Sequence, residues 1–257
     1  MHALVTGASS GIGREIARQL SQKGYTVVCC ARTEEALSAL SEQTEGLCLP
    51  FAVDLAEQGA SEAVQAFCLE RGFCIEVLVN CAGFGAVGHH VRHTAGSLAQ
   101  MCRLNVNTPS ELCSIFGKGM RDRGRGFILN VSSVAGFMPI PYFANYSASK
   151  AFLCSLSDSL HEELRPYGVY VCCLSPGPVR TQFHARSNPN YADDEKSLFS
   201  LSAEEVAEAG LRGLFEGRRL VVPGFANRCI IWLERFLPRT LVSRFLALKS
   251  EGRKLTD

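Results

Sequence analysis

The chain contains 257 residues, of which 47% are hydrophobic and 20% charged, and its formal charge at pH 7 is +1. This composition is typical of a globular protein with a full apolar core, and it excludes an intrinsically disordered chain. The charge balance excludes a protein that is drawn to nucleic acid by an overall positive field. No uncharged apolar run reaches about 18 residues, so we expect no membrane-spanning helix.

Twelve cysteines are present, yet no Cys-x-x-Cys pair occurs. Residues 1–6 already have the pattern of a strand, which leaves no room for a signal peptide. We therefore expect a cytoplasmic protein with reduced thiols. The pairs Cys29-Cys30 and Cys172-Cys173 lie in apolar runs, where cysteine packs as a small hydrophobic side chain.

Short apolar or β-branched runs alternate with longer amphipathic stretches along the chain. The runs that predict strands are 2–6, 25–30, 47–52, 75–80, 126–131, 168–174 and 218–222. Apolar strands separated by helices indicate an α/β fold, a doubly wound and mainly parallel seven-stranded sheet with helices on both faces. Residues 1–257 are expected to form one domain. The irregular stretch 176–200 indicates a substrate lid, within a lid region placed at 176–217.

A glycine-rich turn, Thr6-Gly7-Ala8-Ser9-Ser10-Gly11-Ile12-Gly13, joins the first strand to the first helix. Glycines permit a tight turn there and let backbone N–H groups at a helix start approach a phosphate. The spacing Gly-x-x-x-Gly-x-Gly excludes a Walker A loop and differs from the commoner Gly-x-Gly-x-x-Gly turn. The residues assigned to nucleotide binding in this turn are Gly7, Ser9, Ser10, Gly11, Ile12 and Gly13.

The second strand ends in Ala31-Arg32, where a doubly wound fold meets the adenosine ribose of a bound dinucleotide. An acidic residue there would accept from both ribose hydroxyls and repel a 2′-phosphate, whereas a guanidinium pairs with that phosphate. Arg32 therefore favours NADP(H). The alternative is an arginine that is simply exposed to solvent.

Two motifs follow the fifth strand: Asn130-Val131-Ser132-Ser133 and, thirteen residues after Ser133, Tyr146-Ser147-Ala148-Ser149-Lys150. Positions i and i+4 share one face of a helix, so the ammonium of Lys150 can lie near the phenol of Tyr146. A positive charge stabilises a phenolate, so we expect Lys150, with an oxidised nicotinamide, to lower the pKa of Tyr146. Tyr-x-x-x-Lys and Ser-Ser also occur by chance, but their joint order after strand ends favours a catalytic site.

Together these motifs resemble the short-chain dehydrogenase/reductase family, and the resemblance covers nearly the whole chain. It implies a Rossmann fold and hydride transfer between NADP(H) and a carbonyl or alcohol. It also implies that Tyr146 is the acid or base and that Ser133, rather than Ser132, holds the substrate oxygen. Lys150 would also bind the nicotinamide ribose, and Asn105 would complete a proton relay through backbone and water.

The resemblance extends to other strand ends. It implies adenine contact for Asp54, which could instead be a helix cap. In the Asn-x-Ala-Gly segment, Cys81 departs from the family's usual Asn. A Pro-Gly segment after the sixth strand would lie against the nicotinamide, with a helix cap as the alternative role for its last residue. The cofactor contacts so implied are Asn80, Ala82, Gly83, Tyr146, Lys150, Pro176, Gly177, Val179 and Thr181.

The segments around Tyr146 and 160–165 look like the branch of long-chain 3-ketoacyl and hydroxysteroid reductases and of bacterial reductases with unassigned substrates. An apolar stretch at 137–143 flanks the site, so we expect a lipophilic ketone or 3-ketoacyl substrate, although these aromatics could also be core. A non-catalytic NADP(H) sensor or scaffold of the same fold is the alternative. Family habit implies a homodimer or homotetramer through helices near 97–120 and 145–165.

Two features remain outside this account. His89, His90 and His93 cluster, but no acidic residue completes a site, so no metal is expected. Residues 225–248 interleave large apolar side chains with arginines and predict amphipathic helices broken at Pro238, in a C-terminal extension at 225–257. This extension could cover the substrate cleft, form a dimer face or lie on a membrane surface; we favour the first two.

Overall fold

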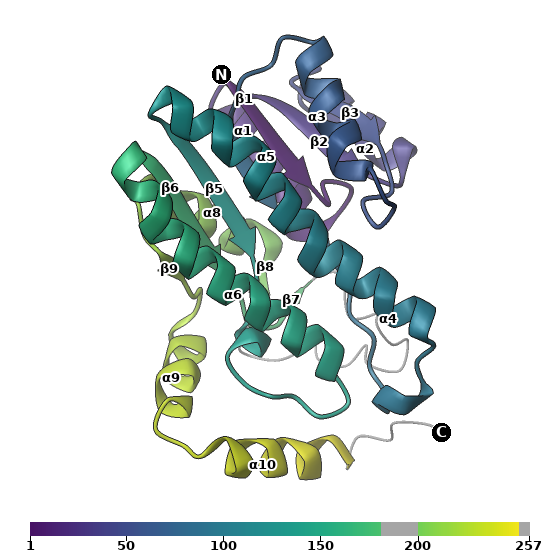
Figure 1. Ribbon diagram of the computed structural model, residues 1–257, viewed down its shortest axis with the longest axis vertical. Helices are drawn as coiled ribbons and strands as arrows, with labels where there is room; N and C mark the ends of the chain where they lie inside the picture. Colours follow the sequence, from purple (N-terminus) through teal and green to yellow (C-terminus); the bar gives the residue numbers. More distant parts are fainter. Residues whose placement is uncertain (181–199, 252–257) are drawn as a thin grey trace.

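A computed structural model describes residues 1–180 and 200–251. Its centre is a parallel sheet of seven strands in the order β3-β2-β1-β4-β5-β6-β9 (Figure 1). This confirms the predicted α/β fold, and the predicted strand boundaries differ from the observed ones by one or two residues at most. The strands are β1 His2–Thr6, β2 Thr26–Ala31, β3 Cys48–Ala52, β4 Ile75–Asn80, β5 Gly126–Val131, β6 Val169–Leu174 and β9 Leu220–Val221.

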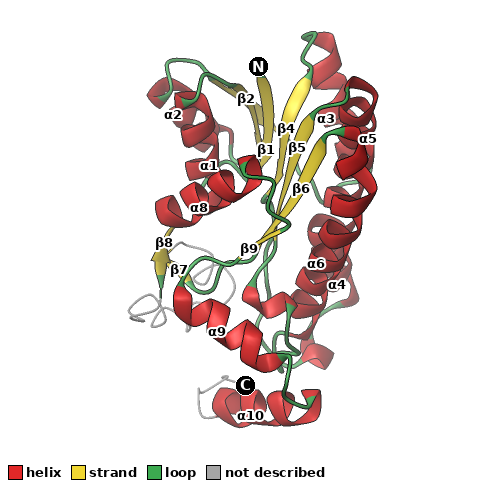
Figure 2. Cartoon of the chain, turned by 90° about the vertical axis from the view of Figure 1, so that its left-hand side faces the viewer, coloured by secondary structure: helices red, strands yellow, loops and turns green. Residues whose placement is uncertain are grey.

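Helices cover both faces of the sheet, which explains why its strands are continuously apolar (Figure 2). One face packs against α1 Gly11–Gln22, α2 Glu34–Gln43 and α8 Ala203–Phe215. The other packs against α3 Ala60–Glu70, α5 Thr108–Arg123 and α6 Ala144–Leu164. The cysteine pairs in β2 and β6 are buried, as predicted.

The helical stretch between β4 and β5 contains an element that the sequence did not predict. The helix α4 Ala95–Cys102 runs into a π-helical turn, η2 Arg103–Asn107, before α5 begins. Such turns often occur at functional sites because they bulge and redirect side chains. Short 3₁₀ turns lie at η1 His90–Arg92, η3 Val134–Gly136 and η4 Arg165–Tyr167.

The predicted lid region is only partly described, because 181–199, including Thr181, lies outside the described residues. The strands on either side, β7 Val179–Arg180 and β8 Leu201–Ser202, pair in parallel. The prediction is wrong for 203–215. That stretch is α8, whose Val206, Leu211 and Leu214 are buried against the sheet as core.

The C-terminal extension forms two helices, α9 Phe225–Glu234 and α10 Arg239–Glu251, with the predicted break at Pro238. Figures 1 and 2 both show α10 at the end of the molecule furthest from the N-terminus. Among the described helices, none has the combined length and apolarity needed to cross a bilayer.

Candidate active site

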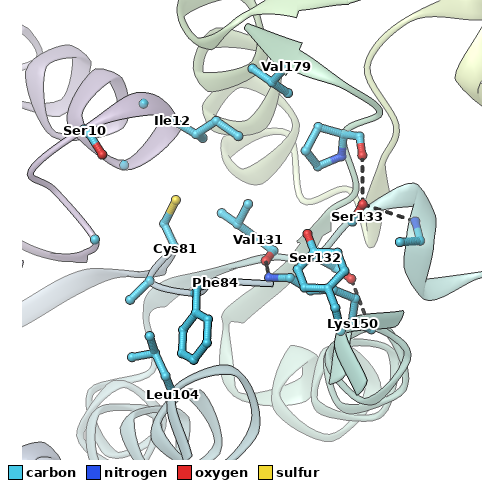
Figure 3. A pocket seen from close by; sticks show the side chains of 18 of the residues that line it. Ser10, Ile12, Cys81, Phe84, Leu104, Val131, Ser132, Ser133, Lys150 and Val179 are labelled. Atoms are coloured by element: carbon cyan, nitrogen blue, oxygen red, sulfur yellow. Dashed lines mark hydrogen bonds between the residues drawn. The ribbon is translucent and has the colours of Figure 1, made fainter. Parts of the chain in front are cut away.

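The carboxyl ends of the parallel strands surround a cavity of about 670 Å³. Figure 3 shows Ser10, Ile12 and Cys81 on one side of it and Ser133 and Lys150 on the other. The structure therefore brings most of the predicted site residues into one cavity. Those that line it are Gly7, Ser9, Ser10, Gly11, Ile12, Gly13, Arg32, Asp54, Ala82, Gly83, Ser133, Tyr146, Lys150, Pro176, Gly177 and Val179.

The first turn of α1 is open to an anion. Its N-cap, Ser10, has an extended backbone and makes no capping hydrogen bond through its side chain, and no acidic residue lies in the first turn. The N–H groups at the start of a helix carry partial positive charge and bind phosphate when they are free to do so. This end of the cavity therefore fits a dinucleotide phosphate.

Two glycines make this approach possible. Gly7 has φ +71°, and a Cβ added to it would lie 2.9 Å from the backbone nitrogen of Ala82. A Cβ on Gly13 would collide with the carbonyl oxygen of Gly7. The turn can thus close against β4 and α1 only without side chains at these two positions.

Arg32 and Asp54 lie at the other end of the same groove. The Arg32 Nη1 atom is 3.9 Å from Asp54 Oδ2, and the arginine side chain is 70% exposed. Asp54 Oδ1 accepts a hydrogen bond from the backbone N–H of Ala56 at 2.9 Å and closes a turn; it is not the helix cap that we considered, because α3 begins at Ala60 with Gly59 as its N-cap. Because this ion pair is long and exposed, it is weak, and the guanidinium can turn towards a phosphate.

The two adjacent serines after β5 have different surroundings. Ser132 donates from its hydroxyl to the carbonyl oxygen of Lys150 at 2.8 Å, away from the phenol. Ser133 Oγ accepts from the N–H of Ala135 at 3.1 Å and donates to the carbonyl oxygen of Pro176 at 3.4 Å, and its hydroxyl lowers the pKa of the Tyr146 phenol. The geometry therefore pairs Ser133, and not Ser132, with the phenol.

Lys150 is buried beside Tyr146. Its ammonium donates to the carbonyl oxygen of Val131 at 2.8 Å and lies 5.6 Å from the centre of the Tyr146 ring (Figure 3). Burial lowers the pKa of Lys150, and Cys81 partly offsets this because its thiolate would raise that pKa.

The pKa of Tyr146 depends on how deeply the phenol is buried. Burial raises the pKa of the phenol well above its ordinary value, and the hydrogen bond with Ser133 only partly opposes this rise. In the chain alone, desolvation of the phenolate dominates; the expectation that Lys150 together with an oxidised nicotinamide lowers this pKa concerns the complex and stays a prediction. Tyr146 is a protonated phenol at neutral pH, ready to donate.

Two predicted residues support the site without lining the cavity. Asn80 Nδ2 donates to Asn130 Oδ1 at 2.8 Å, and Asn130 Nδ2 donates to Ser157 Oγ at 2.9 Å, so this buried row ties β4 and β5 to α6. The fully buried Asn105 lies in the π-helical turn. It accepts from the N–H of Phe84 at 3.2 Å and donates to the carbonyl of Phe84 at 2.9 Å.

One wall of the cavity beside Tyr146 is apolar, and most of it carries no motif in the sequence. The ring of Phe143 stacks on Tyr146 at 4.3 Å between centroids. Tyr142 has φ +62°, a strained backbone for a bulky residue, which is typical of functional sites. Only the apolar stretch 137–143 pointed to this wall. The apolar wall consists of the lining residues Phe84, Val87, Leu104, Ile140, Tyr142 and Phe143.

The histidine cluster lies next to the apolar wall of the cavity. The ring of His89 meets Tyr142 edge-on at 4.9 Å. Within 1–180 and 200–251, no three His, Cys, Asp or Glu side chains come together as metal ligands.

Known proteins share this architecture. Residues 1–192 match the family model described as short chain dehydrogenase. The very-long-chain 3-oxoacyl-CoA reductase of Pyrenophora tritici-repentis is 33% identical over 261 residues, which cover 97% of this chain and 73% of the relative. A short-chain dehydrogenase from Sphingobium yanoikuyae in complex with NADPH is 28% identical with a TM-score of 0.79, over 99% of this chain and 94% of that one.

A third similar protein is the bulky-bulky ketone specific alcohol dehydrogenase of Comamonas testosteroni. It is 28% identical with a TM-score of 0.75, over 92% of this chain and 94% of that one. These matches confirm the resemblance that the motifs indicated. The chain belongs to the short-chain dehydrogenase/reductase family of oxidoreductases.

Proposed function

We propose that the protein is an NADPH-dependent carbonyl reductase, or in reverse an alcohol dehydrogenase, for lipophilic ketones or 3-ketoacyl groups. The observation that carries this proposal is the single cavity in which a free helix N-terminus and the Ser133, Tyr146 and Lys150 side chains face the same space. Such a site holds a dinucleotide and a proton donor on either side of a reacting carbonyl.

Each residue then has a role set by its surroundings. Tyr146 donates a proton to the carbonyl oxygen, because its raised pKa keeps it protonated. Ser133 holds the same oxygen through its hydroxyl. Lys150 positions the phenol and binds the nicotinamide ribose, and Asn105 relays the proton through its backbone and water while its side chain positions Phe84. When bound, the nicotinamide supplies the hydride and, once oxidised, a positive charge beside Tyr146.

The preference for NADPH rests on Arg32. It lines the adenosine end of the cavity, its side chain is 70% exposed, and its ion pair with Asp54 is long at 3.9 Å. A guanidinium so placed can form a charge-assisted pair with a ribose 2′-phosphate. The solved relative from Sphingobium yanoikuyae, with its bound NADPH, supports this choice.

The preference for a lipophilic substrate rests on the apolar wall beside Tyr146. Apolar and aromatic lining with few polar groups favours a substrate that buries hydrocarbon. Two similar proteins are named for such substrates, a very-long-chain 3-oxoacyl-CoA reductase and a bulky-bulky ketone specific alcohol dehydrogenase.

A substrate panel followed by NADPH absorbance tests the proposal. We expect oxidation of NADPH with bulky ketones or 3-ketoacyl thioesters, and a loss of about 100-fold or more in kcat for Tyr146→Phe with unchanged NADPH affinity. Tyr167→Phe, at an exposed tyrosine, is the matched control. Binding of NADPH without turnover across ketones, aldehydes and thioesters would instead identify a non-catalytic sensor or scaffold.

A further inference from the structure

Helices α9 and α10 and the turn between them present a set of large apolar side chains to solvent, which we call the C-terminal apolar surface. Trp232 is 63% exposed, Phe236 68% and Phe245 67%. Soluble monomers seldom expose so many large side chains in one short segment unless the segment binds something. We define the surface by Phe225, Trp232, Phe236, Leu241, Phe245 and Leu248.

The spacing of these residues shows that they are not misplaced core. In α9 the buried side chains, Asn227 and Ile231, lie four positions apart and form the inward stripe. Phe225 and Trp232 fall on the opposite side at helical spacing, and the ring of Phe236, in the turn after α9, is in edge-on contact with Trp232 at 4.9 Å. In α10, Leu241, Phe245 and Leu248 share a second stripe by the same rule.

The inward stripe of α9 is anchored beside the catalytic cavity. Gly177, which lines that cavity, lies so close to Asn227 that a Cβ on the glycine would collide with the asparagine amide. Asn227 in turn donates to the carbonyl of Pro223 at 2.8 Å. The outward stripe therefore belongs to a helix that is held in place beside the catalytic cavity.

The charged residues around the C-terminal apolar surface indicate which kind of partner binds there. Residues 225–248 contain four exposed arginines, Arg228, Arg235, Arg239 and Arg244, and a single carboxylate, Glu234. A second copy of the chain on a twofold axis would set these arginines against one another, because such an interface pairs a patch with itself. An anionic lipid surface instead offers phosphates to the arginines and an interfacial layer to tryptophan and phenylalanine.

We propose that the C-terminal apolar surface docks on the surface of an anionic phospholipid bilayer. The aromatic and leucine side chains enter the layer below the headgroups, and the arginines pair with lipid phosphates. This docking does not depend on the catalytic proposal, and it holds α9, which packs beside the catalytic cavity through Asn227, against the membrane.

The fluorescence of Trp232 reports this docking directly, because it is the only tryptophan in the chain. The full-length protein is mixed with vesicles of phosphatidylcholine alone, or with about one third phosphatidylglycerol, at low and high salt. We expect a blue shift of the emission and sedimentation with the anionic vesicles at low salt, both weakened by high salt.

Variants separate docking from folding. Phe236→Ser with Phe245→Ser, and separately Arg235→Gln with Arg239→Gln, should each weaken vesicle binding about 10-fold or more and leave the circular dichroism unchanged. Leu69→Ser, at a leucine of α3 that is 67% exposed, is the matched control and should bind as the unmodified chain does.

Two outcomes overturn the proposal. One is an unchanged emission with the protein left in the supernatant of anionic vesicles at low salt. The other is a dimer, seen by light scattering without lipid, that the double serine variant dissociates, since a second copy would then occupy the surface.

Discussion

The ammonium of Lys150 donates to the backbone carbonyl of Val131 at 2.8 Å, and this bond joins helix α6 to the carboxyl end of β5. Lys150 is almost fully buried, so its removal takes a buried donor away from the carbonyl oxygen of Val131. The same side chain lies beside the Tyr146 ring, so the link fixes the helix and the phenol together.

We predict that Lys150→Met lowers kcat about 100-fold or more, because the variant loses the charge and the hydrogen bond that hold the acid-base group. The free energy of unfolding should fall by about 1 to 3 kcal/mol, since the carbonyl of Val131 is left buried without its donor. Steady-state kinetics and urea unfolding measure the two effects. Lys118→Met, at a lysine whose side chain is 74% exposed, should change neither.

The buried row of Asn80, Asn130 and Ser157 leads to a second prediction, in which stability falls and cofactor affinity does not. Asn80→Leu removes the amide donor to Asn130 Oδ1 and leaves only the weak thiol donor of Cys113, so we expect the free energy of unfolding to fall by about 1 to 3 kcal/mol. The affinity for NADPH should hardly change, because the Asn80 side chain does not line the cavity. Isothermal titration calorimetry measures the NADPH affinity of the variant, and thermal unfolding measures its stability. A large loss of affinity at unchanged stability would restore Asn80 as a direct cofactor contact.

The glycine turn gives a third prediction. Gly13→Ala places a Cβ against the carbonyl oxygen of Gly7, and that backbone cannot move without opening the phosphate cradle. We expect NADPH to bind at least 10-fold more weakly, a loss of about 1.4 kcal/mol or more in binding free energy, or the folded protein to be lost. Gly96→Ala is the control, since a Cβ there meets nothing within 4 Å and alanine is preferred within a helix.

The sequence predicted those parts of the molecule that depend on local pattern. The strands were found because burial on both faces makes them continuously apolar, and Ser133, Tyr146 and Lys150 were found because a helix and a strand end fix their spacing. The paired strands β7 and β8 are two residues each, too short for any hydrophobic pattern.

Other features depend on contacts between distant segments. Phe84 and Leu104 reach the apolar wall only because the π-helical turn and Asn105 hold the chain after β4 in place. The raised pKa of Tyr146 follows from burial, which the spacing of two side chains on a helix does not reveal.

Arg32 leads to a prediction about cofactor choice. Arg32→Glu should weaken NADPH binding about 10-fold or more, because it replaces an attraction for the 2′-phosphate by repulsion, and it should leave NADH binding equal or stronger. Fluorescence titration with each cofactor measures the ratio. Arg125→Glu, at an arginine that is also 70% exposed but lies at the start of β5, keeps the ratio unchanged. Equal losses for both cofactors in Arg32→Glu would show that the arginine serves only the fold.

The pH dependence follows from the raised pKa of Tyr146. Ketone reduction needs the protonated phenol, and a pKa above the ordinary value of about 10 keeps the phenol protonated, so kcat/KM for reduction should stay level from about pH 7 to 9. Alcohol oxidation needs the phenolate, so its rate should rise with pH over the same range, because each step in pH increases the deprotonated fraction. Initial rates in both directions across a buffer series test this sign. A reduction rate that falls between pH 7 and about 8 would show that the acid titrates near neutrality, against the burial that the structure gives Tyr146.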